Sequence, residues 1–235
     1  MKMQTGLSRI KVAAVAFCTA LLAQFAFAAN TYFVAVDDPS ASDEANLGTE
    51  EVPFKTIQAA IDKAGSGDTI EVAPGTYKTS VRLDGSIQYR LKISGKVLTI
   101  NGTEGAEKTT IEGVYDTTGA NSVCGIFFKN AGGTIIRGFT IAKCSHAGYG
   151  SMSYNDTNEQ ICYFADCIIK GNYCSSKGIS RFCTFVRCRI VNNAAAQNAV
   201  GWHSKFVDSI IANNRGGSSY APLYDDAAYN CSFID

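Results

Sequence analysis

The sequence predicts an all-β solenoid, in which short strands stack coil upon coil. The first observation is a spacing of 21 residues between Phe164, Phe185 and Phe206 (185 − 164 = 206 − 185 = 21). The second is an asparagine near the end of each repeat, at positions 172, 193 and 214. The third is that the apolar and β-branched residues of the repeats show no helical spacing. A fixed period in this range is typical of folds in which each unit packs only on its neighbours.

Four segments between residues 161 and 235 share the repeat. They begin at Cys162 (CYFADCII), Cys183 (CTFVRCRI), Ser204 (SKFVDSII) and Cys231 (CSFID). Stacked strands lie about 4.8 Å apart, so each repeat position should form a column along the solenoid. This alignment predicts inward Phe and Ile columns, with Phe233 as the last member of the Phe column. It also predicts a charged column at a bend, formed by Asp166, Arg187, Asp208 and Asp235.

Two more columns carry cysteine. One contains Cys162, Cys183 and Cys231, and the other contains Cys167 and Cys188. Equivalent positions in neighbouring coils lie within disulfide range, so the placement fits both buried thiols and disulfides between coils. Paired CxxC spacing typical of zinc sites is not found, so neither a metal site nor a cofactor is predicted. A Ca²⁺ ion is compatible with the acidic loops, although no motif supports it.

Residues 1–28 have the pattern of a signal peptide. Lys2, Arg9 and Lys11 precede an apolar run, and Ala26-Phe27-Ala28 fits a cleavage site. Cleavage would leave one β-helical domain, residues 29–235, with 18 basic (21 − 3) and 21 acidic residues, a net charge of −3. We therefore expect a secreted or surface-exposed bacterial protein without a transmembrane segment. The negative charge excludes the electrostatic footprint of a nucleic-acid-binding protein.

One amphipathic helix is expected at about residues 54–64. Ile57, Ala60, Ile61 and Ala64 share one helical face, and Gly65 suits the helix end. The first coil of a solenoid exposes an apolar end. The helix is therefore predicted to cap it.

The stretch from Pro53 to Tyr77, with PFKTIQAAID and GDTIEVAPGTY, carries a specific resemblance. It resembles the N-terminal segment of right-handed parallel β-helix proteins of the pectate-lyase-like superfamily. The resemblance extends over residues 31–235 and implies that fold. It implies chemistry less closely, because the superfamily includes lyases, hydrolases, esterases and adhesins. The Arg-x-Pro-x-x-Arg segment of pectate lyases and the Asn-Thr-Asp segment of polygalacturonases are not found, so no specific enzyme family is matched.

Two departures from the period indicate a candidate site. The steps from Ile136 to Phe164 and from Phe206 to Phe233 are both longer than the period, with the extra residues at 145–160 and 215–228. They predict two walls of a lateral groove at one corner, suited to a sugar chain. The candidate catalytic carboxylates are Asp156, Glu159, Asp225 and Asp226. The candidate substrate-binding residues are His146, Tyr149, Tyr154, Arg215, Tyr220 and Tyr224.

The sequence therefore predicts a secreted or cell-surface protein that binds an extracellular polysaccharide or another cell-surface component. No catalytic motif is recognised in this segment. One alternative is a polysaccharide lyase or glycoside hydrolase that uses the groove carboxylates. Another is an adhesin or passenger-type structural protein. The last repeat stops at Asp235, within a copy, which predicts that the full-length protein is longer.

Overall fold

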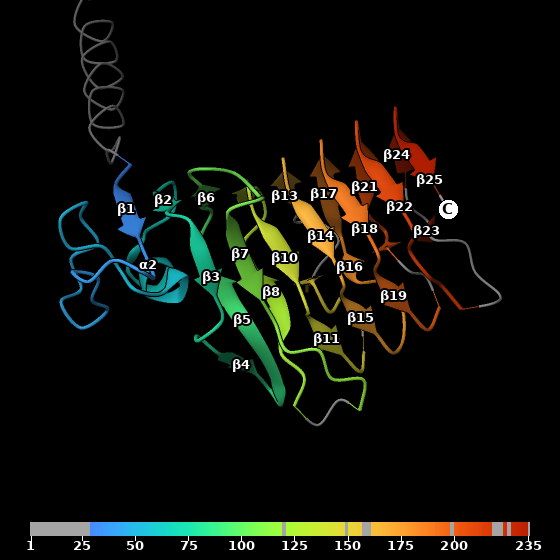
Figure 1. Cartoon of the computed structure of the whole chain (residues 1–235), viewed down its shortest axis with the longest axis horizontal. Coiled ribbons are helices and arrows are strands. Elements are labelled where there is room, and N and C mark those ends of the chain that lie inside the picture. Colours follow the sequence, from blue (N-terminus) through green and yellow to red (C-terminus); the bar gives the residue numbers. More distant parts are fainter. Residues whose placement is uncertain are drawn as a thin grey trace, which may run out of the picture.

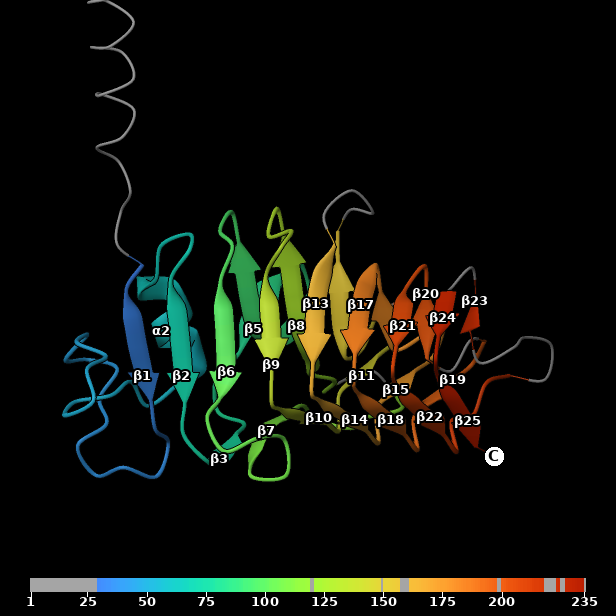
Figure 2. The same ribbon diagram turned by 90° about the horizontal axis from the view of Figure 1, so that it is seen from above.

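The strands wind into stacked coils and form one elongated solenoid, as Figures 1 and 2 show. The structure is a computed structural model that describes residues 29–118, 121–148, 150–156, 161–197, 200–217, 223–224 and 227–234. Apart from one antiparallel hairpin, the strand pairs within its sheets are parallel. The predicted parallel β-helix is confirmed.

Four sheets form the faces of the solenoid, and each full coil of the C-terminal half visits them in the same order. The first sheet contains β1 (Thr31–Val34), β2 (Thr69–Val72), β6 (Thr99–Gly102), β9 (Ile135–Arg137), β13 (Cys162–Ala165), β17 (Cys183–Val186), β21 (Lys205–Val207) and β24 (Ala227–Tyr229). The second contains β3 (Gly75–Tyr77), β7 (Thr109–Glu112), β10 (Thr140–Ala142), β14 (Ile168–Lys170), β18 (Arg189–Val191), β22 (Ile210–Ala212) and β25 (Ser232–Ile234).

The other two faces are a short third sheet and a longer fourth sheet. The third contains β11 (Ser145–His146), β15 (Tyr173–Cys174) and β19 (Ala194–Ala195). The fourth contains β4 (Arg82–Asp84), β5 (Ile87–Ser94), β8 (Cys124–Lys129), β12 (Ser153–Asn155), β16 (Ser180–Arg181), β20 (Gly201–Trp202) and β23 (Leu223–Tyr224), with β4 and β5 as the antiparallel hairpin.

The core consists of the predicted columns. Phe164, Phe185 and Phe206 are fully buried, and their rings stack with centroids 5.1 and 5.2 Å apart. Ile169 pairs with Ile141 and Ile190 in the second sheet. Alternation along each strand sends every second side chain inward, so one repeat position per strand builds a continuous apolar column.

The corners of the coils follow one rule. A residue with left-handed backbone turns the chain, such as Asp166 (φ 53°) or Asn192 (φ 56°), and the next residue points inward. Asn193, which follows Asn192, accepts a hydrogen bond from Asn172 Nδ2 and donates one from its own Nδ2 to Asn214 Oδ1, both 2.9 Å long. Buried amides need such partners, so the Asn column is a structural ladder.

Cys167, Cys183 and Cys188 occupy the same inward positions at other corners. The amide N of Cys188 donates to Ser209 Oγ (3.1 Å), and that of Cys183 donates to Ser204 Oγ (3.5 Å). All the cysteines within the described ranges are free thiols, and Cys231 alone among them is not buried. The structure therefore has the thiol form of the two alternatives.

The predicted register of the last coil is wrong. Phe233 pairs with Ile211, so it continues the Ile column, whereas Ala228 pairs with Phe206. This coil is slightly longer than the regular repeat. Its Cys-Ser-Phe sequence resembles the start of the first-sheet strands, but Ser232–Ile234 form β25 of the second sheet. Cys231 therefore follows the corner residue Asn230 (φ 50°).

Asn230 also replaces Asp235 in the predicted charged column. Its Nδ2 donates to Asp208 Oδ1 at 2.7 Å. Asp235 itself lies outside the described residues. The rest of that column holds as predicted: Arg187 donates from Nε and Nη2 to the two carboxylate oxygens of Asp166, at 2.7 and 2.9 Å.

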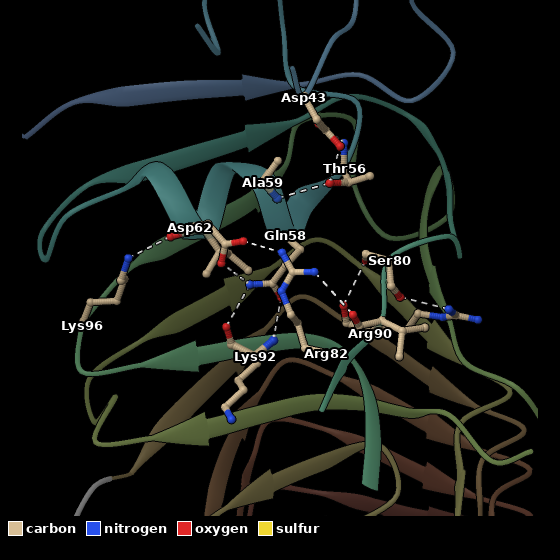
Figure 3. Close-up of polar contacts among 12 residues, drawn as sticks. Asp43, Thr56, Gln58, Ala59, Asp62, Ser80, Arg82, Arg90, Lys92 and Lys96 are labelled. Carbon is tan, nitrogen blue, oxygen red and sulfur yellow. Dashed lines mark hydrogen bonds and ion pairs between the residues drawn. The ribbon is translucent and has the colours of Figure 1, made fainter. Parts of the chain in front are cut away.

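Helix α2 (Ile57–Lys63) lies at the N-terminal end of the solenoid, as expected for a cap (Figure 1). It starts later than residue 54 because Phe54 forms a bridge with Val34 and Thr56 is the N-cap, accepting from Ala59 N at 3.2 Å. Figure 3 shows how the buried Gln58 joins helix and sheet: its Nε2 donates to Asp62 Oδ1 (2.8 Å) and to the Lys92 carbonyl (3.1 Å).

Candidate functional site

The outward side chains of the fourth sheet form a column of aromatic and basic residues. The register pairs Phe127 with Lys92 and Tyr154, and Arg181 with Tyr154 and Trp202. Their strand neighbours, such as Ile126 and Phe128, are buried in the core, so alternation turns the column outward. We call Lys92, Phe127, Tyr154, Arg181 and Trp202 the aromatic–cationic stripe.

Within the stripe, Arg181 lies between Tyr154 and Trp202. Its Cζ is 5.0 Å from the ring centroid of Tyr154, 5.1 Å from that of Trp202 and 4.6 Å from that of Phe182. Its Nη1 also donates to Tyr154 Oη at 2.6 Å. Lys177 adds a second cation, with Nζ 4.2 Å from the Trp202 ring. Cations over aromatic faces are attracted by the ring quadrupole, so the rings orient both side chains.

The N-terminal end of the stripe is more firmly packed. The Phe127 ring lies 5.0 Å from that of Tyr89 and 5.6 Å from that of Tyr154, and only 2% of Phe127 is exposed. Burial raises the pKa of Tyr89, so its hydroxyl stays neutral. Lys92 ends the stripe, paired with Asp84 at 3.0 Å. A cavity of about 270 Å³ adjoins it, lined by Gln58, Ile61, Asp62, Arg82, Lys92, Ser94 and Lys96.

The stripe continues around the corner towards the first sheet. Phe182 (φ 54°) and His203 (φ 53°) turn the chain there, and their rings stack 5.4 Å apart. A hollow of about 190 Å³ follows, lined by Ile161, Phe182, Cys183, Thr184, His203 and Lys205. The partly exposed rings and cations therefore extend over two faces of the solenoid.

The structure divides the predicted site residues between two faces. His146 lies in β11 of the third sheet, and Arg215 forms a bridge with Ala194 of β19. Both residues therefore lie along the third sheet. Tyr154 lies in the stripe, and the backbone of Tyr224 pairs with Trp202 in the fourth sheet. Tyr149, Glu159, Tyr220, Asp225 and Asp226 lie outside the described residues.

The predicted pair of groove walls is also corrected. From Ser153 to Cys162 is nine residues, but the equivalent step from Ser180 to Cys183 is three, so six extra residues separate β12 from β13. The last coil has only one extra residue, because Ala228 rather than Phe233 follows Phe206 in the column. The first insertion is therefore present, between β12 and β13, whereas the second one expected came from the misaligned last repeat.

Asp156 is the one candidate catalytic carboxylate within the described ranges. It follows β12, two residues after Tyr154, and its amide N donates to the Phe128 carbonyl at 3.3 Å. Its Oδ1 is buried, with no hydrogen-bond partner among the residues described. Across the same ranges, no cluster of three or more His, Cys, Asp or Glu could hold a metal ion. No helix there is long and apolar enough to cross a membrane.

Sequence reasoning missed most of the stripe. It does not single out Phe127, Arg181, Trp202 and Lys177, nor the stacked pair of Phe182 and His203. The signal is present, because Arg181 and Trp202 are 21 residues apart, the same period as the Phe column. The columns predicted from the sequence cover the first two sheets and the Asn corner but not the fourth sheet.

Comparison with solved structures places the fold. A rhamnogalacturonan lyase superposes with a TM-score of 0.54 at 12% identity, over 86% of this chain and 56% of that one. The fold is a right-handed parallel β-helix. A pectate lyase, Pel9A, aligns with a TM-score of 0.43 at 14% identity, over 89% of this chain and 79% of that one. The chain thus spans little more than half the length of the first lyase.

Sequence comparisons add one match. Residues 40–88 match a family model described as a protein of unknown function, DUF1565. The matched segment includes α2, β2, β3 and β4. A comparison with curated proteins found no match.

Proposed function

We propose that this protein is an extracellular β-helix that binds polysaccharide along the aromatic–cationic stripe. The observation that carries the proposal is Arg181 held in register between the rings of Tyr154 and Trp202. Aromatic rings offer flat apolar faces on which sugar rings pack, and a guanidinium donates several hydrogen bonds in a fixed geometry. The two kinds of group alternate here on consecutive coils.

The shape of the stripe favours a linear polymer. Its members are related by the coil stacking, so the stripe runs along the solenoid axis, perpendicular to the strands. From Lys92 to Trp202 there are four steps of about 4.8 Å, or about 19 Å. A surface this long and narrow suits several consecutive sugars.

The charges favour an acidic polysaccharide. Lys177 and Arg181 both lie against the rings, and Lys205 lines the adjoining hollow. Carboxylate or sulfate groups on the sugars would form charge-assisted hydrogen bonds with them. The name of the rhamnogalacturonan lyase supports a polysaccharide as the ligand class, and the signal-peptide pattern of residues 1–28 supports secretion.

The test is a binding assay against a panel of immobilised acidic and neutral polysaccharides, with the purified chain and two variants. Trp202→Ala and Tyr154→Ala should each weaken binding about fivefold, because an aromatic contact contributes on the order of 1 kcal/mol. Tyr173→Ala is the matched control, since Tyr173 lies in the third sheet. Retention by no polysaccharide, or equal loss in the control, would overturn the proposal.

A lyase function is the second candidate, and Asp156 is the observation that favours it. Its carboxylate has one buried oxygen and follows Tyr154 closely in the chain, and a lyase needs a base beside the bound sugar. Abstraction of the proton beside the carboxylate of a uronate, with cleavage of the bond to the glycosidic oxygen on the next carbon, would leave an unsaturated sugar that absorbs in the ultraviolet. Measuring this absorbance with the polysaccharides that bind distinguishes a lyase from a binding protein.

A further inference from the structure

The aromatic–cationic stripe ends against helix α2. Lys92 of β5 is its last member, and β4, the next strand of the sheet, pairs only with residues 87–89 of β5 and so does not reach Lys92. The side chain of Gln58 takes the place of a strand there. Its Oε1 accepts from the Lys92 amide N at 2.8 Å, and its Nε2 donates to the Lys92 carbonyl at 3.1 Å. The helix therefore lies where the stripe would otherwise continue.

The cavity of about 270 Å³ at this end lies between α2, β4 and β5. Helix α2 contributes Gln58, Ile61 and Asp62, which are three or four residues apart and therefore share one face of the helix. The hairpin adds Arg82 from β4 and Lys92 from β5. This hairpin departs from the parallel winding of the coils, and the departure is what brings Arg82 to the cavity.

Lys96 also lines the cavity, and its charge is not neutralised by an ion pair. Among the described residues, no carboxylate lies within 4.0 Å of its Nζ. The Nζ instead donates to the carbonyls of Ile61 and Ala64 at the end of α2, at 2.9 and 2.6 Å (Figure 3). An ammonium group has three donors, so one N–H of Lys96 remains for a ligand.

The other two cations of the cavity pair with carboxylates and also keep donors. Lys92 Nζ donates to Asp84 Oδ1 and to the Leu83 carbonyl, both at 3.0 Å, which uses two of its three donors. Arg82 donates from Nη2 to Asp62 and keeps other N–H groups of its guanidinium. The cations outnumber the two carboxylates that they contact, so the cavity attracts a negatively charged group.

The carboxylate in the cavity wall favours an acidic sugar over a bare anion. Asp62 Oδ1 accepts from Gln58, and its Oδ2 accepts from Arg82. A carboxylate has about four lone-pair sites, so Asp62 can also accept from sugar hydroxyl groups. The same carboxylate repels sulfate, which has no hydroxyl group to donate. Pockets for small molecules are usually about 300–1,000 Å³, so a cavity slightly below this range suits one sugar residue.

We propose that this cavity binds one acidic sugar residue of the polysaccharide, at the end of the stripe next to α2. The three cations hold its carboxylate or sulfate group, and Asp62 accepts from its hydroxyl groups. Lys92 belongs to both the stripe and the cavity, with its Nζ 5.5 Å from the centroid of the Phe127 ring, so the two surfaces are continuous. The inference rests on the proposed function, because this sugar is part of the chain that the stripe holds.

The experiment titrates the isotopically labelled chain with glucuronate, with glucose and with sodium sulfate at constant ionic strength, and follows its amide NMR signals. The side-chain amide of Gln58 and the backbone amide of Ser94 are local reporters, since both residues line the cavity. Glucuronate should shift both signals saturably. Glucose, which has no charge, should not shift them at the same concentrations, and sulfate should require a higher concentration than glucuronate.

Two variants test the cations. Arg82→Gln and Lys96→Gln should each raise the glucuronate midpoint about tenfold, because each removes charge-assisted hydrogen bonds. Lys108→Gln is the charge-matched control, since Lys108 pairs with Glu104 outside the cavity and is well exposed. Melting temperatures check that each variant folds, and Arg82→Gln leaves the contacts of Lys96 with α2 intact.

Any of four results would overturn the inference. They are no saturable shift with glucuronate, an equal response to glucose, sulfate binding as tight as that of glucuronate, and an equal loss in Lys108→Gln. If polysaccharides are retained through Tyr154 and Trp202 in spite of such a result, the proposed function stands without this cavity. Glucuronate binding here without retention of any polysaccharide would overturn the proposed function and keep the cavity as a site for a free acidic sugar.

Discussion

The guanidinium of Arg181 lies between the rings of Tyr154 and Trp202, about equally far from the two centroids, at 5.0 and 5.1 Å. The three residues belong to β12, β16 and β20, so consecutive coils bring them together. The packing therefore fixes a cation within an aromatic surface. On our proposal this arrangement recognises the acidic groups of a polysaccharide.

Arg181→Gln should weaken binding of acidic polysaccharides about tenfold or more and leave neutral ones little affected. The reason is the loss of charge-assisted hydrogen bonds, which are about twice as strong as neutral ones. Affinity measured from low to high salt should also fall less steeply in the variant. Arg187→Gln, on another corner, is the charge-matched control. Equal effects of both changes would argue against a specific role for Arg181.

Asn193→Ala should destabilise the fold by about 2 kcal/mol or more, since each buried polar group left unsatisfied costs about 1–3 kcal/mol. The change leaves the Asn172 amide N, the Asn172 Nδ2 and the Ile169 carbonyl without their bonds to the Asn193 side chain. Urea unfolding measures the loss. Asn192→Gly, at the adjacent exposed left-handed position, should stay close to wild type; a similar loss there would contradict the ladder.

Asp166→Asn should reduce stability by less than about 1 kcal/mol at neutral pH, because the ion pair with Arg187 is largely exposed. The hydrogen bond from Arg187 lowers the pKa of Asp166. The contribution is therefore present above the unfolded pKa of about 3.9 and is lost as the pH falls through the lower folded value. The unfolding free energies of the two proteins should differ at pH 7 and converge at pH 2–3. A difference that grows in acid would refute this.

Asp156→Asn distinguishes the two functional candidates. If the chain is a binding protein, the variant should retain polysaccharides as well as wild type does, and neither should produce ultraviolet-absorbing ends. If it is a lyase, wild type should form these ends and the rate of the variant should be at least 100-fold lower. A general base typically contributes about 10²–10⁴-fold to the rate. Melting temperatures of both proteins control for folding.

Much of the fold could be predicted because a solenoid repeats its environment every coil. The Phe, Ile and Asn columns follow from one period, and Arg187 between Asp166 and Asp208 was placed correctly. The register of the last coil could not be predicted. Its Cys-Ser-Phe sequence resembles the first-sheet strands, whereas Ser232–Ile234 pair as β25 of the second sheet. One added residue was enough to shift its column.

The stripe was harder to predict because its residue types change at every coil. Phe127, Tyr154, Arg181 and Trp202 share a position, but an arginine interrupts three different aromatic residues, whereas core columns repeat one apolar type. An outward position has no packing requirement to keep it constant, so periodicity alone does not reveal it. The register is what joins these residues.

The most direct test uses Trp202, the single tryptophan of the chain. Its intrinsic fluorescence, followed during titration with the acidic polysaccharide that the panel binds best, reports on the stripe itself. We predict a saturable change whose midpoint matches the affinity from the binding assay and shifts to higher concentration in Arg181→Gln. Binding in the assay with unchanged Trp202 fluorescence would place the ligand elsewhere and contradict the account.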